Sequence, residues 1–317
     1  MTRPIVLGVV GDSGTGKTTL TRGLMRVMGA EQVSLISADD YHRYERRERV
    51  QLGITPLHPD ANHLDIFTQH LLHLRRGEAV LKPVYNHRNG TLGRPIYTRA
   101  ARFLIVEGLL NYHTETLRSA HDVRVFLAPP EELRRAWKLK RDSTRRGYTT
   151  NEVLAELDRR ERDAAQYIRP QRAHADIVVS FQASRVADPA HLDVEVLLRD
   201  TLPHPDLSPL LEGHGDGPTL LREDQDLLLR IPGDIDPAHA AELEETVWRR
   251  MSFANHLRVR RLGEFALGTD LLRSDSLALV QLLVLYHLVW ARANLSRGAM
   301  PDRAQGRQLG GVTALRA

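Results

Sequence analysis

The sequence predicts an α/β fold, in which a doubly wound and mostly parallel sheet is followed by a smaller α+β unit. Continuous apolar runs, typical of strands that are buried on both faces, recur over residues 4–10, 33–37, 103–108, 123–128 and 176–181. Between them lie stretches whose apolar residues repeat at helical spacing, as in residues 18–28 and 65–76. Strands that alternate with helices favour a parallel sheet with helices on both faces.

The composition changes between residues 183 and 218, where Pro, Gly, His and Asp become frequent, and we place a domain boundary in this segment. One domain is expected over residues 1–200 and a smaller α+β domain over residues 205–300, followed by a polar tail over residues 301–317. The elements expected in the second domain are a strand at 226–231, a helix that Asp236 caps and that ends near Met251, one or two strands within 257–267, and a strongly apolar helix over 276–292.

The composition argues against several classes of function. With 44 basic and 40 acidic residues, the net charge of +4 does not indicate a nucleic-acid-binding protein, and the absence of cysteine excludes disulfides and thiol catalysis. The first strand begins almost at once, which leaves no room for a signal peptide. The most apolar helix, over residues 276–290, is interrupted by Gln281 and His287 and looks too short to cross a bilayer. We therefore expect a cytoplasmic protein whose partners include neither nucleic acid nor membrane.

A glycine-rich segment between the first strand and the first helix carries the strongest motif. Residues 11–18 read GDSGTGKT, which matches G-x-x-x-x-G-K-[ST], the signature of a phosphate-binding loop. In such a loop the backbone N–H groups surround the phosphates of a nucleotide, the lysine adds a positive charge, and the last hydroxyl can bind Mg²⁺. The candidate nucleotide-binding residues are Gly11, Asp12, Ser13, Gly14, Thr15, Gly16, Lys17, Thr18 and Thr19.

Acidic residues follow two of the predicted strands. Asp39 and Asp40 come shortly after the run at 33–37, and Glu107 lies at the end of the run at 103–108. Because ligands of open α/β sheets bind beyond the carboxyl ends of the strands, these carboxylates are candidates for an active site, with Glu107 next to Mg²⁺. Asp39 and Asp40 would point to opposite sides of a continuing strand, and the sequence does not decide which one faces the site.

Positive charge is concentrated in two segments. Residues 43–49 form a dense run of charges directly after the acidic pair, where they either contact an anionic substrate or form a solvated helix face. A helix that opens at Pro129 and Pro130 places four basic residues on one face, namely Arg134, Lys138, Arg141 and Arg145.

Four ordered stretches make the chain resemble the phosphoribulokinase/uridine kinase family of P-loop kinases, and within it the phosphoribulokinase branch: residues 11–18, 39–42, 82–87 and 141–147. The resemblance implies ATP and Mg²⁺ as cofactors. It implies that Asp39 accepts the proton of the attacking hydroxyl, that Lys17 assists catalysis, and that Thr18 and Glu107 hold Mg²⁺. The nucleotide site would also include Arg141 and Arg146, and the implied substrate-binding residues are Asp40, Tyr41, His42, Arg46, Lys82, Tyr85, His87 and Lys138.

The resemblance therefore implies a kinase that transfers the γ-phosphate of ATP to a hydroxyl of a sugar phosphate, with ribulose 5-phosphate as the expected acceptor and ribulose 1,5-bisphosphate as the product. Two alternatives stay open: a uridine or cytidine kinase, whose acceptor is uncharged, and a nucleotide-binding regulator without catalysis. A homodimer or higher homo-oligomer is the default assembly. Thr15 and Ser37 stand where redox-regulated members of the branch carry cysteines, which excludes that form of control here.

Overall fold

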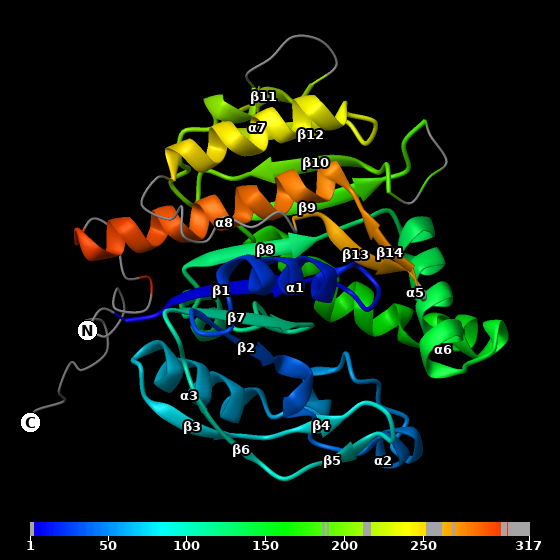
Figure 1. Cartoon of the computed structure of the whole chain (residues 1–317). Helices are drawn as coiled ribbons and strands as arrows, with labels where there is room; N and C mark the ends of the chain where they lie inside the picture. The colour runs from blue at the N-terminus through cyan, green and yellow to red at the C-terminus, as the bar shows by residue number, and fades with distance from the viewer. Residues whose placement is uncertain are drawn as a thin grey trace, which may run out of the picture.

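The computed structural model describes residues 3–185, 188, 190–211, 217–251, 262–267, 270–298 and 303, without the side chains of Arg145, Arg146 and Leu267. Among these residues, eight strands form one sheet in the order β11-β12-β10-β9-β8-β1-β7-β2 (Figure 1). Five strands are parallel: β1 (Ile5–Val10), β2 (Val33–Ser37), β7 (Phe103–Gly108), β8 (Val123–Leu127) and β9 (Ile177–Gln182). At one edge the pairing becomes antiparallel, in β10 (Asp193–Leu198), β12 (Asp226–Ile231) and β11 (Thr219–Glu223).

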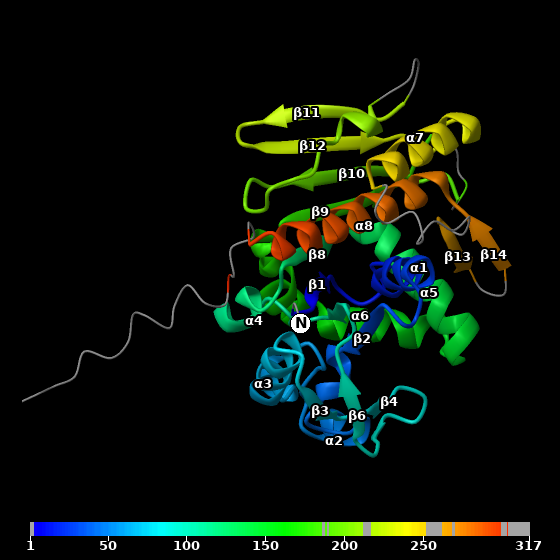
Figure 2. The same cartoon turned by 60° about the vertical axis from the view of Figure 1, so that its left-hand side comes forward.

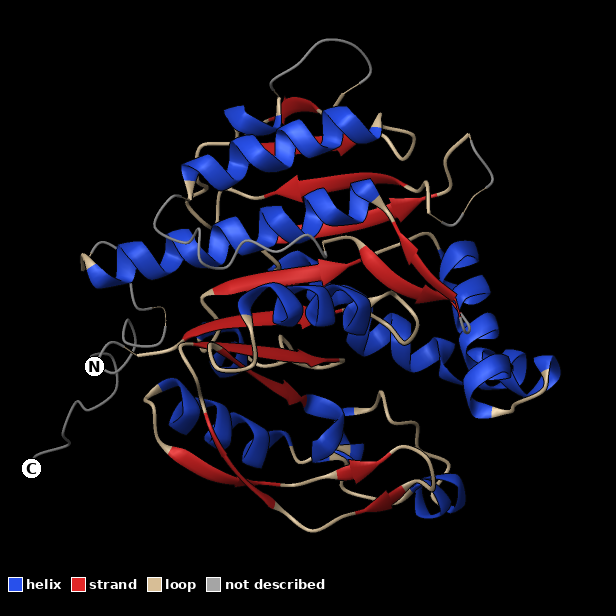
Figure 3. Cartoon of the chain, in the orientation of Figure 1, coloured by secondary structure: helices blue, strands red, loops and turns tan. Residues whose placement is uncertain are grey.

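Helices surround this sheet (Figure 3). In the described part of the chain they are α1 (Lys17–Met28), α2 (Arg46–Gln51), α3 (Leu64–Arg75), α4 (Glu115–Ser119), α5 (Glu131–Arg146), α6 (Thr150–Asp163), α7 (Pro237–Arg250) and α8 (Asp275–Ser296). Short antiparallel ribbons complete the fold: β3 (Ala79–Lys82) with β6 (Ile96–Arg99), β4 (Tyr85–Asn86) with β5 (Thr91–Leu92), and β13 (Glu264–Leu267) with β14 (Asp270–Arg273).

The side chains of β1 alternate between the two faces of the sheet, as the period of two in a strand requires. Ile5, Leu7 and Val9 belong to a hydrophobic cluster with residues of α1, α7 and α8, whereas Val6 belongs to a second cluster with residues of α3 and α4. Figure 1 shows α1, α7 and α8 lying along one face. The predicted doubly wound, mostly parallel sheet is therefore confirmed.

The domain boundary expected within residues 183–218 does not interrupt the sheet. Strand β10 pairs antiparallel with β9, where Asp193 lies opposite Gln182, and β12 then pairs with β10. One hydrophobic cluster contains Leu24 of α1 together with Leu229 of β12 and α8 residues such as Leu283. Strands β10, β11 and β12 thus share a sheet with the first part of the chain, as Figure 2 shows for β9 to β12, and α7 and α8 share its core.

Most of the elements expected after the boundary are present. The strand at 226–231 is β12, and the helix that begins after Asp236 is α7, with the Asp236 carboxylate accepting hydrogen bonds from the first N–H groups. The expected strands within 257–267 correspond in part to β13, while residues 257–261 lie outside the described part of the chain. The tail over 301–317 also lies outside it, apart from Arg303.

Helix α8 is longer than the sequence pattern suggests, and the expectation that it is too short to cross a bilayer is wrong. Among the described residues it is the one helix whose length of 22 residues and composition would suit a membrane span, but 83% of its apolar stretch is buried inside the protein. Gln281 accepts a hydrogen bond from the Gly263 N–H (2.9 Å), and His287 is hydrogen-bonded to His204 (3.0 Å). This burial is typical of the core helix of a soluble protein.

Candidate active site

The phosphate-binding loop joins β1 to α1, where the motif predicts it. Gly14 and Gly16 have φ angles of +94° and +92°, which residues with a Cβ rarely adopt. A Cβ on Gly14 would lie 3.0 Å from Lys138 Cβ of α5, so the loop packs closely against that helix. Thr15 is buried, and its hydroxyl donates a hydrogen bond to the carbonyl oxygen of Asp12 (2.9 Å). The loop is therefore held by its own backbone and by α5.

Lys17 extends its side chain over the loop. Its Nζ donates hydrogen bonds to the carbonyl oxygens of Gly11 (2.7 Å) and Asp12 (2.9 Å). Burial lowers the pKa of Lys17, while the carboxylates of Asp39, Asp12 and Glu107 act to raise it. The charge of the motif lysine therefore interacts with those of Asp39 and Glu107, two of the three acidic candidates that the sequence indicated.

The carboxylate of Glu107 lies at the end of β7, within reach of α1. Thr18 Oγ1 donates a hydrogen bond to Glu107 Oε1 (3.3 Å), and Thr21 Oγ1 donates a shorter one to Glu107 Oε2 (2.7 Å). The structure thus brings together the two residues that the resemblance assigns to the metal. Thr21, which lies one helical turn after Thr18, is an addition that the motifs do not indicate.

The geometry distinguishes the two acidic residues that follow β2. Both lie in a single 3₁₀ turn, Ala38–Tyr41. Asp40 belongs to the scaffold, because its Oδ1 accepts a hydrogen bond from the Tyr85 N–H (2.9 Å) and its Oδ2 pairs with Lys82 Nζ. Asp39 instead lies within electrostatic reach of Lys17. Asp39 also lines a small cavity with Asn62 and Leu109, and it is the acid of the pair whose charge acts on Lys17.

Asp39 is surrounded by groups that favour its charged form. Burial acts to raise the pKa of Asp39, but His42, His87, Lys17 and Arg160 act to lower it, and the net pKa lies below the ordinary value for an aspartate. The side chain is therefore a carboxylate at neutral pH, in the form that can accept a proton.

An aromatic and imidazole cluster lies next to Asp39. The rings of His42 and Tyr85 meet edge to face with centroids 4.7 Å apart, and those of Tyr85 and His87 do so at 5.1 Å. His42 Nδ1 is hydrogen-bonded to Asn62 Oδ1 (2.7 Å). Burial lowers the pKa of His42 to about 4, although Asp39 acts in the opposite direction, so the imidazole is neutral at pH 7. The three expected residues of this cluster are therefore close together.

Two arginines of α2 approach this cluster in different ways. Arg46 Nη2 donates a hydrogen bond to the carbonyl oxygen of His87 (2.6 Å). Arg49 is buried, with 7% of its surface exposed, and donates hydrogen bonds to the Tyr85 hydroxyl (2.7 Å) and to the Tyr44 carbonyl (2.5 Å). Within the described residues, Arg49 forms no ion pair with a carboxylate. A buried guanidinium whose charge is not balanced in this way favours an anionic ligand nearby.

Three of the expected substrate-binding residues, Tyr41, Asp40 and Lys82, are bonded to other groups of the protein. Tyr41 is 1% exposed, packs against Phe67 with ring centroids 4.9 Å apart, and is hydrogen-bonded through its hydroxyl to His70 Nδ1 (3.1 Å). Lys82 is buried and bound to Asp40. The structure therefore assigns Tyr41 to the core, and the Asp40–Lys82 pair to the connection between the acidic turn and β3.

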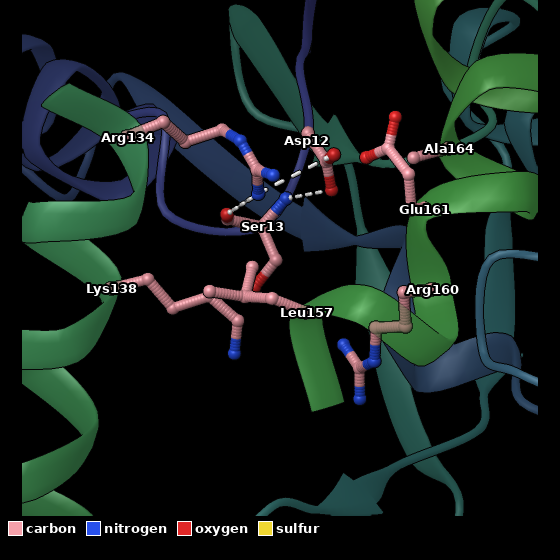
Figure 4. Close-up of a pocket in the computed structure, with 8 residues that line it drawn as sticks. All are labelled: Asp12, Ser13, Arg134, Lys138, Leu157, Arg160, Glu161 and Ala164. Carbon is pink, nitrogen blue, oxygen red and sulfur yellow. Dashed lines mark hydrogen bonds and ion pairs between the residues drawn. The ribbon is translucent and has the colours of Figure 1, made fainter. Parts of the chain in front are cut away.

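A pocket lies between the loop, α5 and α6 (Figure 4). Arg134 of α5 donates a hydrogen bond to the Ser13 carbonyl (2.9 Å) and pairs with the Asp12 carboxylate (3.4 Å). Arg160 of α6 enters from the other side, and its charge acts on both Asp39 and Asp12. The pocket is lined by Asp12, Ser13, Arg134, Lys138, Leu157, Arg160, Glu161 and Ala164.

The end of α5 carries the remaining basic candidates. Lys138 Nζ pairs with Asp142 Oδ2 (2.8 Å), and Arg141 Nε pairs with Asp142 Oδ1 (2.8 Å). Arg141 Nη2 also donates a long hydrogen bond to Ser13 Oγ (3.4 Å). Burial acts to raise the pKa of Asp142, but the bonds from Arg141 and Lys138 lower it to about 2. The side chain of Arg146 lies outside the described residues.

Sequence reasoning missed three residues of this region: Thr21, Arg49 and Arg160. Thr21 offered a signal, because residues three apart on a helix share a face and Thr18 was already a candidate. Arg49 and Arg160 lie in helices rich in charged residues, where the residue type alone does not show which positions are buried and which are solvated. Their positions depend on contacts with distant segments.

Comparisons with known proteins agree with this geometry. A model of the phosphoribulokinase/uridine kinase family matches residues 6–187. The phosphoribulokinase of Synechocystis sp. is 36% identical over 186 residues, which cover 59% of this chain and 56% of that protein. The uridine kinase of Leuconostoc citreum is 31% identical over 185 residues, which cover 56% of this chain and 87% of that protein. The chain thus spans about half the length of the curated phosphoribulokinases that it matches.

A solved structure shares the fold beyond the matched sequence. The phosphoribulokinase from Rhodobacter spheroides superposes with a TM-score of 0.59 at 19% identity, over 80% of this chain and 98% of that one. At this identity the likeness concerns the fold alone. Together with the loop and the acidic residues, the match over residues 6–187 shows that the chain belongs to the phosphoribulokinase/uridine kinase family.

Proposed function

We propose that this chain is an ATP- and Mg²⁺-dependent kinase that phosphorylates a hydroxyl of a sugar phosphate, with ribulose 5-phosphate as the acceptor and ribulose 1,5-bisphosphate as the product. One observation carries the proposal: the charge of Asp39 interacts with that of Lys17 in the phosphate-binding loop, and among the described residues Asp39 forms no ion pair, whereas Asp40 pairs with Lys82. A protein that only binds nucleotide has no need of such a carboxylate, which argues against a non-catalytic regulator.

The loop residues 11–19 supply the nucleotide site in this proposal. Their backbone N–H groups face the phosphates, and the N-terminus of α1 adds a favourable dipole. Lys17 binds phosphate oxygens in place of the two loop carbonyls that it now contacts. Arg141 lies near the end of α5, where it closes over the same phosphates, and we keep Arg146, the last residue of that helix, as a proposed member of the nucleotide site.

The residues present fit a magnesium ion. Thr18 Oγ1 and Glu107 Oε1 are 3.3 Å apart, close to the separation of about 3 Å between adjacent ligands of an octahedral ion with bonds of about 2.0–2.1 Å. No group of three His, Cys, Asp or Glu side chains in the described part of the chain could hold a metal alone. That is typical of Mg²⁺, which takes few protein ligands and completes its shell with water and phosphate oxygens. Bound Mg²⁺ would neutralise phosphate charge during transfer.

The reaction then follows from the position of Asp39. Its carboxylate accepts the proton of the acceptor hydroxyl as the hydroxyl oxygen forms a bond to the γ-phosphorus. The bond between that phosphorus and the bridging oxygen breaks, and ADP leaves with the bond's electron pair. Lys17 stabilises the negative charge that collects on the phosphate oxygens.

The cationic surroundings of the acceptor side support a phosphorylated sugar over a nucleoside. Arg49 is a buried cation beside Tyr85, and Arg46 lies on the neighbouring backbone of His87. A dianionic phosphate group would balance these charges, whereas an uncharged nucleoside would leave them unpaired. Phosphoribulokinases and uridine kinases are both similar to this chain, with 36% identity for the phosphoribulokinase of Synechocystis sp. and 31% for the uridine kinase of Leuconostoc citreum.

The acceptor is tested by measuring ADP release with ATP and Mg²⁺ against ribulose 5-phosphate, uridine, cytidine and no acceptor. We expect turnover with ribulose 5-phosphate. Turnover with a nucleoside alone would establish the uridine or cytidine kinase alternative. ATP binding without turnover on any of the acceptors would favour a regulator.

The phosphate contact is tested by comparing Arg49→Gln with Arg46→Gln. Loss of a charge-assisted contact of 1.5–3 kcal/mol should raise KM for the phosphorylated acceptor by about 10- to 100-fold in Arg49→Gln, with KM for ATP changed by less than about twofold. A similar effect in Arg46→Gln would mean that both arginines bind the phosphate. Equal changes of both KM values would contradict the assignment.

We further propose that the enzyme acts in the cytoplasm as a homodimer or higher homo-oligomer. Its near-balanced charge and the burial of α8 are consistent with a soluble state. Light scattering after size-exclusion chromatography measures the assembly directly, and a monomeric mass would remove that part of the proposal.

A further inference from the structure

The hydroxyl of Thr21 has an unusual hydrogen-bond partner, the side chain of Glu107. In a helix interior, a threonine hydroxyl ordinarily bonds back to the carbonyl three or four residues earlier. Here that carbonyl, Thr18 O, is 3.4 Å away, whereas Glu107 Oε2 is 2.7 Å away. The hydroxyl of a fully buried side chain is thus committed to a carboxylate 86 positions along the chain.

This contact makes the two oxygens of Glu107 different. Oε2 is held by the buried Thr21, while Oε1 faces the exposed hydroxyl of Thr18 at a longer distance of 3.3 Å. The backbone of Glu107 lies opposite Val9 of β1, the strand that leads into the phosphate-binding loop. Helix α1 and strand β7 are therefore joined through one carboxylate at the edge of the nucleotide site.

A carboxylate that is free to rotate presents either oxygen, or both, to a cation. Magnesium demands near-ideal octahedral geometry, so a ligand that is already oriented loses less entropy on binding. A hydroxyl of matching position, supplied by the same helix that carries Thr18, provides this orientation.

We propose that Thr21 is a positioning residue, which holds Glu107 so that Oε1 is directed at the magnesium ion of the nucleotide complex. The inference rests on the proposed function of the site, because it concerns the Mg²⁺ that accompanies ATP. Thr21 touches neither nucleotide nor acceptor, and its effect passes through Glu107.

The test uses Thr21→Val, which keeps the shape of the side chain and removes the hydroxyl, and Thr21→Ser, which keeps the hydroxyl. Binding of a non-hydrolysable ATP analogue to the full chain is measured by calorimetry during a MgCl₂ titration and again in EDTA. Loss of an outer-shell partner of a metal ligand typically costs 10- to 100-fold in metal affinity. We expect Thr21→Val to raise the half-saturating Mg²⁺ concentration by about that factor, with analogue binding in EDTA within about twofold of the wild type.

Two further measurements separate orientation from a general loss of structure. Thr21→Ser should restore the Mg²⁺ dependence to within about threefold of the wild type, since it restores the donor. In a Glu107→Gln background, Thr21→Val should add almost nothing, because its partner no longer carries the charge. Both results are read from binding, so they do not depend on turnover.

The outcomes distinguish the inference from the function on which it rests. If the wild-type chain binds the analogue without any dependence on Mg²⁺, the proposed metal site itself fails. If the wild type depends on Mg²⁺ and Thr21→Val matches it, only the role of Thr21 fails. Equal weakening of binding in Mg²⁺ and in EDTA would show that Thr21 merely supports the packing of α1.

Discussion

Asp39 and Asp40 are adjacent in sequence, but their side chains serve different parts of the molecule. Asp40 connects the turn after β2 to the backbone of Tyr85 and to Lys82. Asp39 interacts with Lys17 and Arg160, whose positive charges stabilise its carboxylate. A 3₁₀ turn directs the two carboxylates to different sides, which a strand-based argument from the sequence leaves undecided.

This division predicts that two similar substitutions affect different properties, one the turnover and the other the stability. Asp39→Asn should lower kcat by about 10²- to 10⁴-fold, the usual contribution of a general base, while ATP binding and the melting temperature change little. Asp40→Asn should instead destabilise the protein by about 3 kcal/mol, because Lys82 is left buried without its counter-charge. Steady-state kinetics and urea unfolding measure the two effects. Full turnover in Asp39→Asn would assign the base to another group.

A buried histidine outside the site should make stability depend on pH. His121 is fully buried, its Nδ1–H donates to the Leu117 carbonyl (2.7 Å), and its Nε2 has no hydrogen-bond partner in the described residues. Burial lowers the pKa of His121 to about 4, and Arg124 and Arg75 act in the same direction. In the unfolded chain the pKa returns to about 6.5, so unfolding takes up a proton below that pH.

The sign follows from that difference. Stability from the neutral imidazole is fully present above pH 6.5 and is lost as the pH falls from about 6.5 to about 4, by up to about 3 kcal/mol. Urea unfolding of wild type and His121→Leu at pH 7 and pH 4.5 tests this prediction. The variant should lose less stability on acidification than the wild type, and parallel losses would contradict the role of His121.

At the scale of single residues, the sequence predicts what is local. The loop motif, Asp39 and Glu107 are recognisable because each lies at the end of a strand whose apolar run is visible. Thr21, Arg49 and Arg160 acquire their importance from partners that are distant in sequence, such as Thr21 and Glu107, 86 positions apart. Tyr41 shows the opposite error: it lies within the stretch 39–42 and was expected to bind substrate, but it is a core residue.

At the scale of elements, the contact between α1 and α8 links the nucleotide site to the end of the described chain. Gln281 is buried between them, donating a long hydrogen bond to the Thr19 carbonyl (3.5 Å) and accepting one from the Gly263 N–H (2.9 Å). A Cβ on Gly23 of α1 would lie 2.1 Å from Gln281 Nε2. The absence of a side chain at Gly23 therefore makes room for the amide.

This contact predicts that the effect of Gly23→Ala on stability changes sign with the residue at position 281. Gly23→Ala should destabilise the wild type by about 1–2 kcal/mol, because displacement of a buried, hydrogen-bonded amide outweighs the gain in helix propensity of about 1 kcal/mol. In a Gln281→Ala background the clash is gone, and the same change should stabilise. Urea unfolding of the four variants measures the coupling. Destabilisation of equal size in both backgrounds would contradict the proposed fit.

The elements themselves were largely readable from period and length. The parallel strands and α7 lie where the apolar runs and the Asp236 cap predict them. The C-terminal end of α8 could not be predicted in this way. Asn294 and its neighbours are polar and look like the start of a tail, although the helix continues to Ser296.

At the scale of the whole molecule, the antiparallel strands β10 to β12 continue the parallel sheet without a gap. The composition of residues 183–218 suggested a linker, yet the segment contains β10, which pairs with β9 in the sheet. Composition cannot distinguish a linker from loops between strands, because both are rich in turn-forming residues.

A truncated chain tests whether the two parts depend on each other. Residues 1–187 alone lack α8, so the faces of α1 and β1 that contribute to the shared core would be exposed. We expect this fragment to melt without a cooperative transition and to bind a hydrophobic dye, as measured by circular dichroism and fluorescence. A cooperative melt within a few degrees of the full chain would show that the expected boundary is real.

The packing of α8 on α1 also has a consequence for synthesis. Thr19 and Gln281 lie 262 positions apart, so at about 5–20 residues per second the ribosome delivers α8 on the order of 10–50 s after α1. During that interval the apolar residues of α1 and β1 that pack against α8 in the folded protein are exposed to solvent outside the exit tunnel. Ribosomes that stall shortly before Asp275 would therefore display a surface suited to capture by a chaperone.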